Sequence, residues 1–250
     1  MDAEGRISAG NVVDRILMEL VRGSLILPPA SGRESPAELV GTAAGGTIGI
    51  VIAKADSLVV ESLGIGISNQ TIGIIGAKTG SHMHVLAVDE GLKGTNARLI
   101  ISQFPVDSGG DGYGCLLVVA SDSVSDARRA VEISLGEVRK NQKEHFSCKE
   151  GAVHVQYTSH SGAACQYVYG VPEGTAFGLI NASPAVLGIY LADIAIKSAG
   201  ITPVTIAIPG ETHPANESTL FFTGENSAVR CAAEAAREAG KKILESMNGS

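Results

Sequence analysis

The chain contains two copies of one sequence pattern, about 105 residues apart. Four blocks recur in the same order, with only small insertions and deletions between them. The matching blocks are residues 72–75 with 177–180, 88–93 with 192–197, 115–119 with 219–223, and 125–132 with 227–234. Because four blocks in one order rarely arise by chance, we interpret the chain as two copies of one fold unit.

The length of 250 residues suits either one large domain or two domains of about 100 residues. The duplication selects two domains. We therefore predict an N-terminal extension over 1–36, a first domain over 37–143, a linker over 144–151 and a second domain over 152–250.

Composition excludes several classes of partner. Hydrophobic residues make up 44% of the chain and charged residues 18%, yet no apolar run is long enough to cross a bilayer. This apolar surplus indicates subunit interfaces and no membrane association. The net charge of -7 and the absence of a Lys/Arg-rich patch argue against nucleic-acid binding.

The cysteines favour a reducing, cytoplasmic compartment. The four of them are scattered, with no Cys-x-x-Cys pair. Residues 1–5 also lack the basic and apolar regions of a signal peptide.

Residues 11–21 are predicted to form an amphipathic helix that Asn11 caps. Its apolar residues fall on one face, and a linker rich in Pro and Gly follows it at 27–32. A short helix on a tether needs another surface to be stable. It binds a partner, docks back on its own domain, or frays.

Each copy is predicted to contain strand, short helix, strand, helix, strand, loop, strand and helix. In the first copy the expected strands are 38–44, 70–77, 97–104 and 113–120, with an apolar Gly-rich stretch at 47–53. In the second they are 153–157, 175–181, 203–208 and 218–223. Four antiparallel strands with interleaved helices are typical of an α+β sandwich of ferredoxin-like type.

Three sequence phrases carry a resemblance to a known family. Residues 178–180 (Gly-Leu-Ile), 192–199 (Ala-Asp-Ile-Ala-Ile-Lys-Ser-Ala) and 224–229 (Gly-Glu-Asn-Ser-Ala-Val) resemble the bacterial microcompartment (BMC) shell domain. The likeness extends over 38–245. The order of elements is similar to that of circularly permuted tandem shell proteins of the propanediol-utilisation B type, with 38–43 and 153–158 at the permuted starts.

The resemblance implies a structural protein, without catalysis, cofactor or metal. Three tandem chains would form a pseudohexameric homotrimer, and such tiles pack with other shell proteins around encapsulated enzymes. In this family the Lys of an Asp-x-x-x-Lys helix motif lies at the tile edge, which implies edge contacts for Asp89, Lys93, Asp193 and Lys197. The same spacing also suits a solvated helix face.

The resemblance further implies an axial pore lined by the loops 104–114 and 208–218. The implied pore-lining residues are Val106, Asp107, Ser108, Gly109, Gly110, Asp111, Gly210, Glu211, Thr212, His213 and Glu217. Their acids, tripled around an axis, would disfavour anions and tolerate small neutral polar metabolites such as short alcohols, diols or aldehydes. Both loops exceed the family's short Lys-Ile-Gly-Ser loop, so the axis is open, plugged or gated. Alternatively, the acids simply face solvent.

Rival chemistries lack their required patterns. Residues 76–80 lack the Gly-Lys-Ser/Thr order of a phosphate loop, and 64–66 lack the third glycine of a dinucleotide site. His82 and His84 do not share a helix face and are expected to be structural. Cys115 has no companion for an iron-sulfur cluster and is expected to be a buried strand thiol.

The remaining alternative is a trimeric small-molecule-binding regulator of ferredoxin-like fold. A tile should assemble into sheets or shells, whereas a regulator would remain a discrete trimer that binds a ligand. In the tile hypothesis, the helix at 11–21 tethers encapsulated enzymes or another shell component.

Overall fold

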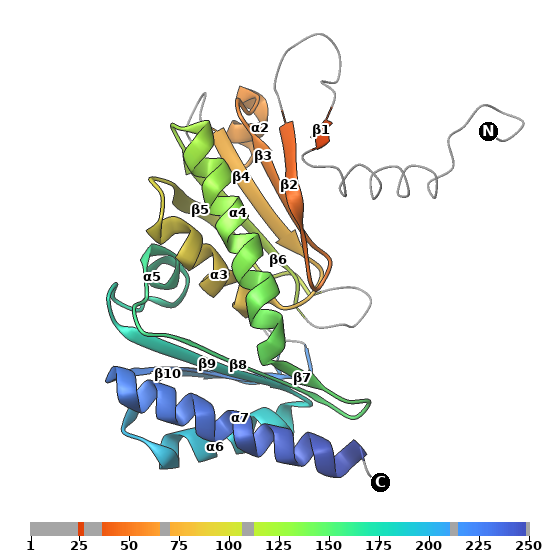
Figure 1. The fold of residues 1–250 in the computed structure, drawn as a ribbon, viewed down its shortest axis with the longest axis vertical. Helices are drawn as coiled ribbons and strands as arrows, with labels where there is room; N and C mark the ends of the chain where they lie inside the picture. Colours follow the sequence, from red (N-terminus) through yellow and green to blue (C-terminus); the bar gives the residue numbers. More distant parts are fainter. Residues whose placement is uncertain (1–24, 28–36, 66–70, 107–112, 211–214, 249–250) are drawn as a thin grey trace, which may run out of the picture.

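The computed structural model describes residues 25–27, 37–65, 71–106, 113–210 and 215–248. The predicted helix at 11–21 lies outside these residues. The described chain folds into two antiparallel sheets with helices (Figure 1), which confirms the α+β class and the tandem arrangement.

The first domain is built on a sheet with the strand order β1-β2-β3-β4-β6-β5. Its strands are β1 (Leu25–Leu27), β2 (Ala37–Ala43), β3 (Thr47–Ile52), β4 (Thr71–Ala77), β5 (Arg98–Gln103) and β6 (Cys115–Ser121). Its helices are α2 (Ser57–Ser62), α3 (Ser81–Lys93) and α4 (Val124–Asn141), the last followed by a 3₁₀ turn at Gln142–Glu144.

The second domain is built on a sheet with the strand order β10-β11-β9-β8-β7. Its strands are β7 (His145–Ser147), β8 (Ala152–Thr158), β9 (Ala176–Ser183), β10 (Ile201–Ala207) and β11 (Ser218–Gly224). Its helices are α5 (Ala163–Tyr169), α6 (Ala185–Ser198) and α7 (Asn226–Asn248).

Each sheet has more strands than the four expected, because the short strands β1 and β7 and the internal strand β3 were not recognised. β1 falls in the predicted extension and β7 in the predicted linker, and each pairs with the strand that follows it. The Gly-rich stretch at 47–53 is a full strand, β3, between β2 and β4.

The extra strands change how the two copies correspond. β3 and β8 both lead into the short helix of their domain, so β3, not the 38–43 strand, is the counterpart of β8. β2 then corresponds to β7. The pairing of residues 115–119 with 219–223 is also wrong by one residue. Ile75 pairs with Leu117, and its equivalent Ile180 pairs with Leu220.

The long helices cover one face of each sheet, α3 and α4 in the first domain and α6 and α7 in the second, because their apolar residues recur at helical spacing. In α4, Ser123 caps the first turn by accepting a hydrogen bond from the Asp126 N–H at 3.2 Å, as the sequence predicts. The buried stripe of α4 consists of Ala127, Ala130, Val131, Ser134, Leu135 and Val138. It packs with β-strand residues such as Leu117 and Val119 in one core cluster.

The first domain stands on the open face of the second sheet, with α6 and α7 on the opposite face (Figure 1). The short helix α5 of the second domain packs against α3 of the first. Leu86 of α3 joins a buried cluster with Cys165 of α5 and Phe221 of β11. No described helix is long and apolar enough to span a bilayer.

Candidate functional site

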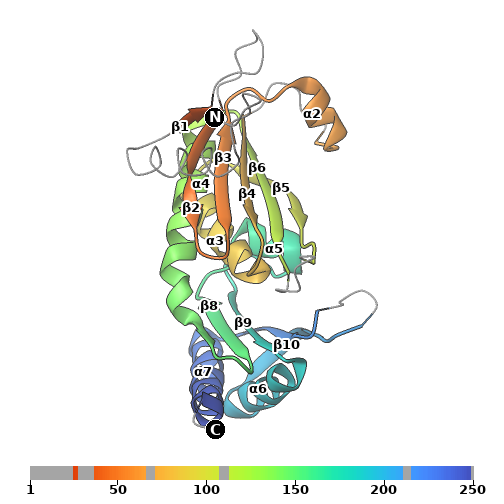
Figure 2. The ribbon, with the colours of Figure 1, turned by 90° about the vertical axis from the view of Figure 1, so that its right-hand side faces the viewer.

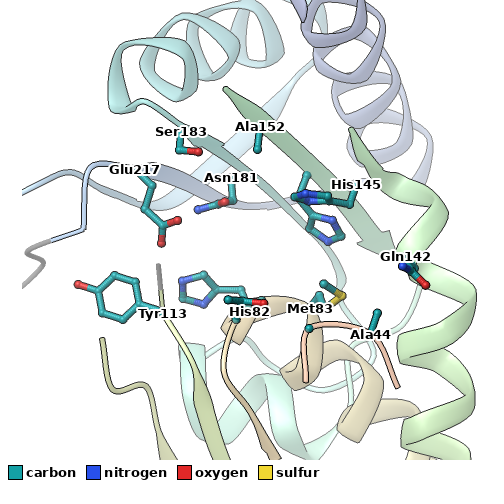
Figure 3. Close-up of a pocket in the computed structure, with 14 residues that line it drawn as sticks. Ala44, His82, Met83, Tyr113, Gln142, His145, Ala152, Asn181, Ser183 and Glu217 are labelled. Atoms are coloured by element: carbon teal, nitrogen blue, oxygen red, sulfur yellow. The ribbon is translucent and has the colours of Figure 1, made fainter. Parts of the chain in front are cut away.

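A pocket of about 370 Å³ lies where the two domains meet. The first domain contributes the β2–β3 turn, the start of α3, Tyr113 two residues before β6, and Gln142 after α4. The second domain contributes β7, β8, β9 and the residue before β11. Figure 3 shows Tyr113 and Glu217 at one end and Gln142 at the other. The lining residues are Ala44, Gly45, Thr79, Gly80, His82, Met83, Tyr113, Gln142, His145, Ala152, His154, Asn181, Ser183 and Glu217.

The acidic end of the pocket is formed by Glu217. Burial raises the pKa of this carboxyl, and a hydrogen bond from the Asn181 side chain opposes the shift. Asn181 also donates to Thr219 Oγ1 at 2.8 Å, which fixes the amide. Tyr113 comes from the first domain and meets Glu217 across the pocket (Figure 3). Burial, with the Glu217 charge as a lesser cause, raises the pKa of this phenol.

Two neutral histidines line the pocket from β7 and β8. His154 is only 6% exposed, and burial lowers its pKa to about 4. Burial also lowers the pKa of His145, whose ring centroid lies 6.1 Å from that of His154. His154 Nε2 faces Gln156 Oε1 at 3.4 Å, so the proton belongs on Nε2. The other nitrogen, Nδ1, has no hydrogen-bond partner among the described residues. It is therefore a buried acceptor for a hydroxyl donor.

These groups favour a small neutral polar occupant. The pocket offers imidazole, amide and hydroxyl groups together with one carboxylate, and no Lys or Arg is among its described lining residues. An anion would have to be desolvated there without a compensating positive charge. A neutral molecule with hydroxyl groups can instead donate to His154 and Glu217.

The histidines at 82 and 84 have different surroundings. His84 is fully buried, with its ring nitrogens next to Thr47 Oγ1 and the Gly80 carbonyl oxygen. This matches the expected structural role. His82 lines the pocket instead, with its ring 4.9 Å from that of Phe221 in an edge-on contact.

Most of the implied axial-pore residues lie outside the described part of the chain. These are Asp107, Ser108, Gly109, Gly110, Asp111, Glu211, Thr212 and His213. Val106 forms an isolated bridge with Tyr113 that closes the base of the first loop. Gly210 ends the described segment after β10. Of this set, Glu217 lines the pocket between the domains.

Asp89 lies buried between the domains. Its side chain is 0% exposed, and its oxygens accept hydrogen bonds from the backbone N–H groups of Gly162 at 2.8 Å and Cys165 at 3.0 Å. These groups open α5, whose N-cap Gly162 has no side chain to cap the helix. Lys93 pairs with Asp89 at 3.0 Å and with Glu90 at 2.6 Å. Burial lowers the pKa of this lysine, but Glu90 and Asp89 together raise it above its usual value.

The equivalent pair in α6 faces solvent. Lys197 contacts Asp193 at 2.7 Å, and their side chains are 74% and 56% exposed. The two copies of the Asp-x-x-x-Lys motif therefore have the same internal pairing and different surroundings.

Cys115 is a buried thiol at the start of β6, and burial raises its pKa to about 12. The described residues contain no cluster of three or more His, Cys, Asp or Glu side chains suited to a metal ion.

Several pocket residues were not predicted. His145 lies in the segment interpreted as a linker, and Asn181 ends a predicted strand. One signal was available for His154. Together with Gln156 it places two polar side chains on the same face of an otherwise apolar strand.

Comparison with known proteins relates the chain to one family. The model of the BMC domain matches residues 176–248. The bacterial microcompartment shell protein PduB of Citrobacter freundii is 37% identical over 209 residues, covering 83% of this chain and 77% of that protein. The PduB of Limosilactobacillus reuteri is 36% identical over 202 residues, covering 80% of this chain and 85% of that protein.

Solved structures agree with this relationship. EtuB from Clostridium kluyveri superposes with a TM-score of 0.78 at 38% identity, covering 88% of this chain and 95% of that chain. A trimeric PduB superposes with a TM-score of 0.77 at 35% identity, covering 84% of this chain and 93% of that chain. The chain therefore belongs to the family of bacterial microcompartment shell proteins, and its role is structural.

Proposed function

We propose that three copies of this chain form a ring-shaped tile in the shell of a bacterial microcompartment. The observation that carries this proposal is the superposition on a trimeric PduB over 84% of the chain. Two similar domains per chain would give such a ring six similar sectors. The apolar surplus of the sequence, 44% hydrophobic against 18% charged residues, supports extensive subunit contacts.

We further propose that the pocket between the domains admits small neutral polar molecules. The unpartnered Nδ1 of His154 and the carboxyl of Glu217 offer hydrogen bonds to hydroxyl groups. Burial raises the pKa of Glu217, so this site already resists holding one negative charge. A second anion is disfavoured still more. The axial loops remain a second predicted route, with the acids at 107, 111 and 211 at its mouth.

A matched pair of solutes tests the pocket. Propane-1,2-diol and lactate have the same carbon skeleton, but lactate carries a carboxylate. Ligand-observed NMR with the wild-type protein should show binding of the diol and little binding of lactate. Glu217→Gln should reduce this discrimination, whereas Glu150→Gln on the exposed β7–β8 turn should not. Equal binding of both solutes to the wild type would contradict the proposal.

The tile-edge contacts are tested by the exposed lysines. We propose that Lys93 and Lys197 contact neighbouring tiles, because Lys93 is 30% exposed and Lys197 74% exposed. Lys93→Ala and Lys197→Ala should abolish the sheets that electron microscopy of concentrated protein would show. Lys140→Ala is the control, since Lys140 is 73% exposed on α4. Sheets that survive both changes would rule out this edge role.

We also propose that the predicted helix at 11–21 tethers encapsulated enzymes or another shell component. Removing residues 1–36 should leave trimers intact and release the cargo from purified shells. Retention of cargo by the truncated protein would exclude this role.

A further inference from the structure

Two histidines stand opposite each other at the edge of the second sheet. His145 of β7 and His154 of β8 are directly paired in the antiparallel ladder, and their ring centroids are 6.1 Å apart. Cys148 donates a backbone hydrogen bond to the Gly151 carbonyl, so those two residues form a hydrogen-bonded pair. Such pairs alternate with non-hydrogen-bonded pairs, which makes the histidines, three pairs further along, a non-hydrogen-bonded pair. Side chains in pairs of this kind approach each other most closely.

The fold of the domain does not require this histidine pair. β3 and β8 align through the central strands that they pair with, which places Ile48 on His154. Thr42 of β2 is opposite Ile48, so it has the place of His145. The same unit therefore folds with an apolar and a small polar residue at these positions. Because burying an imidazole without partners costs free energy, the two rings indicate a binding role.

The strand β8 lies between α7 and the first domain, as Figure 2 shows. Val153 and Val155 belong to the core cluster that contains Ala236 of α7. His154 and Gln156 alternate with these valines, so both turn toward the first domain, where the pocket lies. The histidine pair is thus open to a ligand from the pocket.

The His154 ring is held in the way that metal-binding histidines are held. Its Nε2 donates to Gln156 Oε1 at 3.4 Å, which leaves the lone pair of Nδ1 for a ligand. Nδ1 is buried and has no hydrogen-bond partner among the described residues. A metal-binding histidine almost always donates its second N–H to an oxygen, which fixes the ring and makes the binding nitrogen more basic. Gln156 supplies that oxygen.

The separation of the rings suits one metal ion between them. A Zn–N bond is about 2.1 Å long, so two imidazoles on one Zn²⁺ have ring centroids about 5–6 Å apart. The observed 6.1 Å is at the upper end of this range. His145 is exposed, so rotation of its own side chain closes the small difference.

The charges around the pair favour a cation. The described lining of the pocket contains the carboxylate of Glu217 and no Lys or Arg. Arg237 of α7 is the permanent positive charge that acts on His154. It is paired with Glu144 at 2.8 Å, so its charge is offset.

We propose that His145 and His154 form a binding site for a divalent transition-metal ion such as Zn²⁺ on the wall of the pocket. Imidazole nitrogen is a preferred ligand of these ions, whereas Mg²⁺ and Ca²⁺ prefer oxygen. Two nitrogens leave further coordination positions, which water fills. A hydroxyl group that donates to Nδ1 in the metal-free pocket coordinates the ion instead. The inference goes beyond the proposed tile and its pocket solute, and it stands without either of them.

Calorimetric titration of the untagged full-length chain with Zn²⁺ tests this site. The wild type should bind one Zn²⁺ per chain, and His145→Ala and His154→Gln should each weaken this binding about tenfold or more. His145 is exposed, so His145→Ala should fold like the wild type, which circular dichroism checks. His160→Ala is the matched control and should bind like the wild type, because His160 is an exposed histidine outside the pair.

A further variant separates a built site from two histidines that meet by chance. Gln156→Leu keeps a side chain of similar volume and removes the oxygen that holds the His154 ring. Both ligands stay in place, yet Zn²⁺ should bind about tenfold more weakly.

A wild type without saturable Zn²⁺ binding would overturn the inference. Full affinity in His145→Ala, in His154→Gln or in Gln156→Leu would overturn it as well. None of these results bears on the trimer or on the neutral solute, which the experiments above test separately.

Discussion

The Asp89 carboxylate accepts a hydrogen bond from the backbone N–H of Gly162 at 2.8 Å, although the two residues belong to different domains. A carboxylate at a helix N-terminus satisfies unpaired N–H groups and complements the positive end of the helix dipole. Gly162 cannot do this with its own side chain, so α5 depends on α3 for its cap. The contact thus fixes how the domains meet, and it places the pocket walls opposite each other.

The first prediction concerns this cap. Asp89→Asn should destabilise the fold by about 2 kcal/mol, because a buried N–H group then faces an amide donor in place of a charged acceptor. Urea unfolding monitored by circular dichroism measures the change.

The matched control for this change is Asp193→Asn. Asp193 is exposed in the single chain, so its loss should change stability by less than about 0.5 kcal/mol there. Equal effects of the two changes would show that the Asp89 contact contributes nothing specific.

The second prediction concerns the close packing of α3 on α4. A Cβ at Gly91 would lie 2.5 Å from the Ala130 carbonyl oxygen of α4. Gly91→Ala should therefore force the helices apart and cost about 2 kcal/mol in unfolding free energy.

Gly136→Ala, by contrast, should stabilise the chain by about 0.5–1 kcal/mol. Gly136 lies on the exposed side of α4, where a Cβ meets nothing within 4 Å. Thermal unfolding of the two variants should shift in opposite directions. If both variants shifted the melting temperature in the same direction, the close packing of α3 on α4 at Gly91 would be contradicted.

The third prediction concerns acid sensitivity. The pKa of His154 is 6.5 in an unconstrained chain and about 4 when folded, because burial disfavours the charged ring. Between these pH values the unfolded chain binds a proton that the folded chain does not. Lowering the pH from 6.5 to 4 should therefore reduce the free energy of unfolding, and His154 should account for up to about 3 kcal/mol of that loss.

His154→Gln should flatten the dependence of the melting temperature on pH between 6.5 and 4. Part of the slope should remain, since burial also lowers the pKa values of His84 and His145. If the melting temperature of His154→Gln depended on pH as steeply as that of the wild type, His154 would not be the source of the acid sensitivity.

The duplication made much of the fold predictable. Helix periodicity and the cap at Ser123 identified α4, and the repeated Asp-x-x-x-Lys spacing identified α3 and α6 as equivalents. Local patterns carry this information because each helix has one apolar face and one end signal.

Edge strands and register were harder to predict. β7 has three residues, too few for an alternating pattern. β3 (Thr-Ile-Gly-Ile-Val-Ile) has the β-branched composition of a strand, and its single glycine received too much weight in the sequence interpretation. β6 is apolar from Cys115 to Ala120, so the apolar centre of β11 at Leu220, Phe221 and Phe222 can be aligned with it at a shift of one residue.

The pocket could not be predicted, because its walls come from separate elements of two domains. His145 and Tyr113 approach only after the domains have docked. The different surroundings of Asp89 and Asp193 have the same origin. Their local sequences are alike, and only the presence of α5 beside α3 separates them.

A cryo-EM structure of the assembled protein tests the central claim most directly. The expected result is a closed ring of three chains, with the two domains of each chain as neighbouring sectors. Discrete single chains, or a ring with another number of chains, would contradict it.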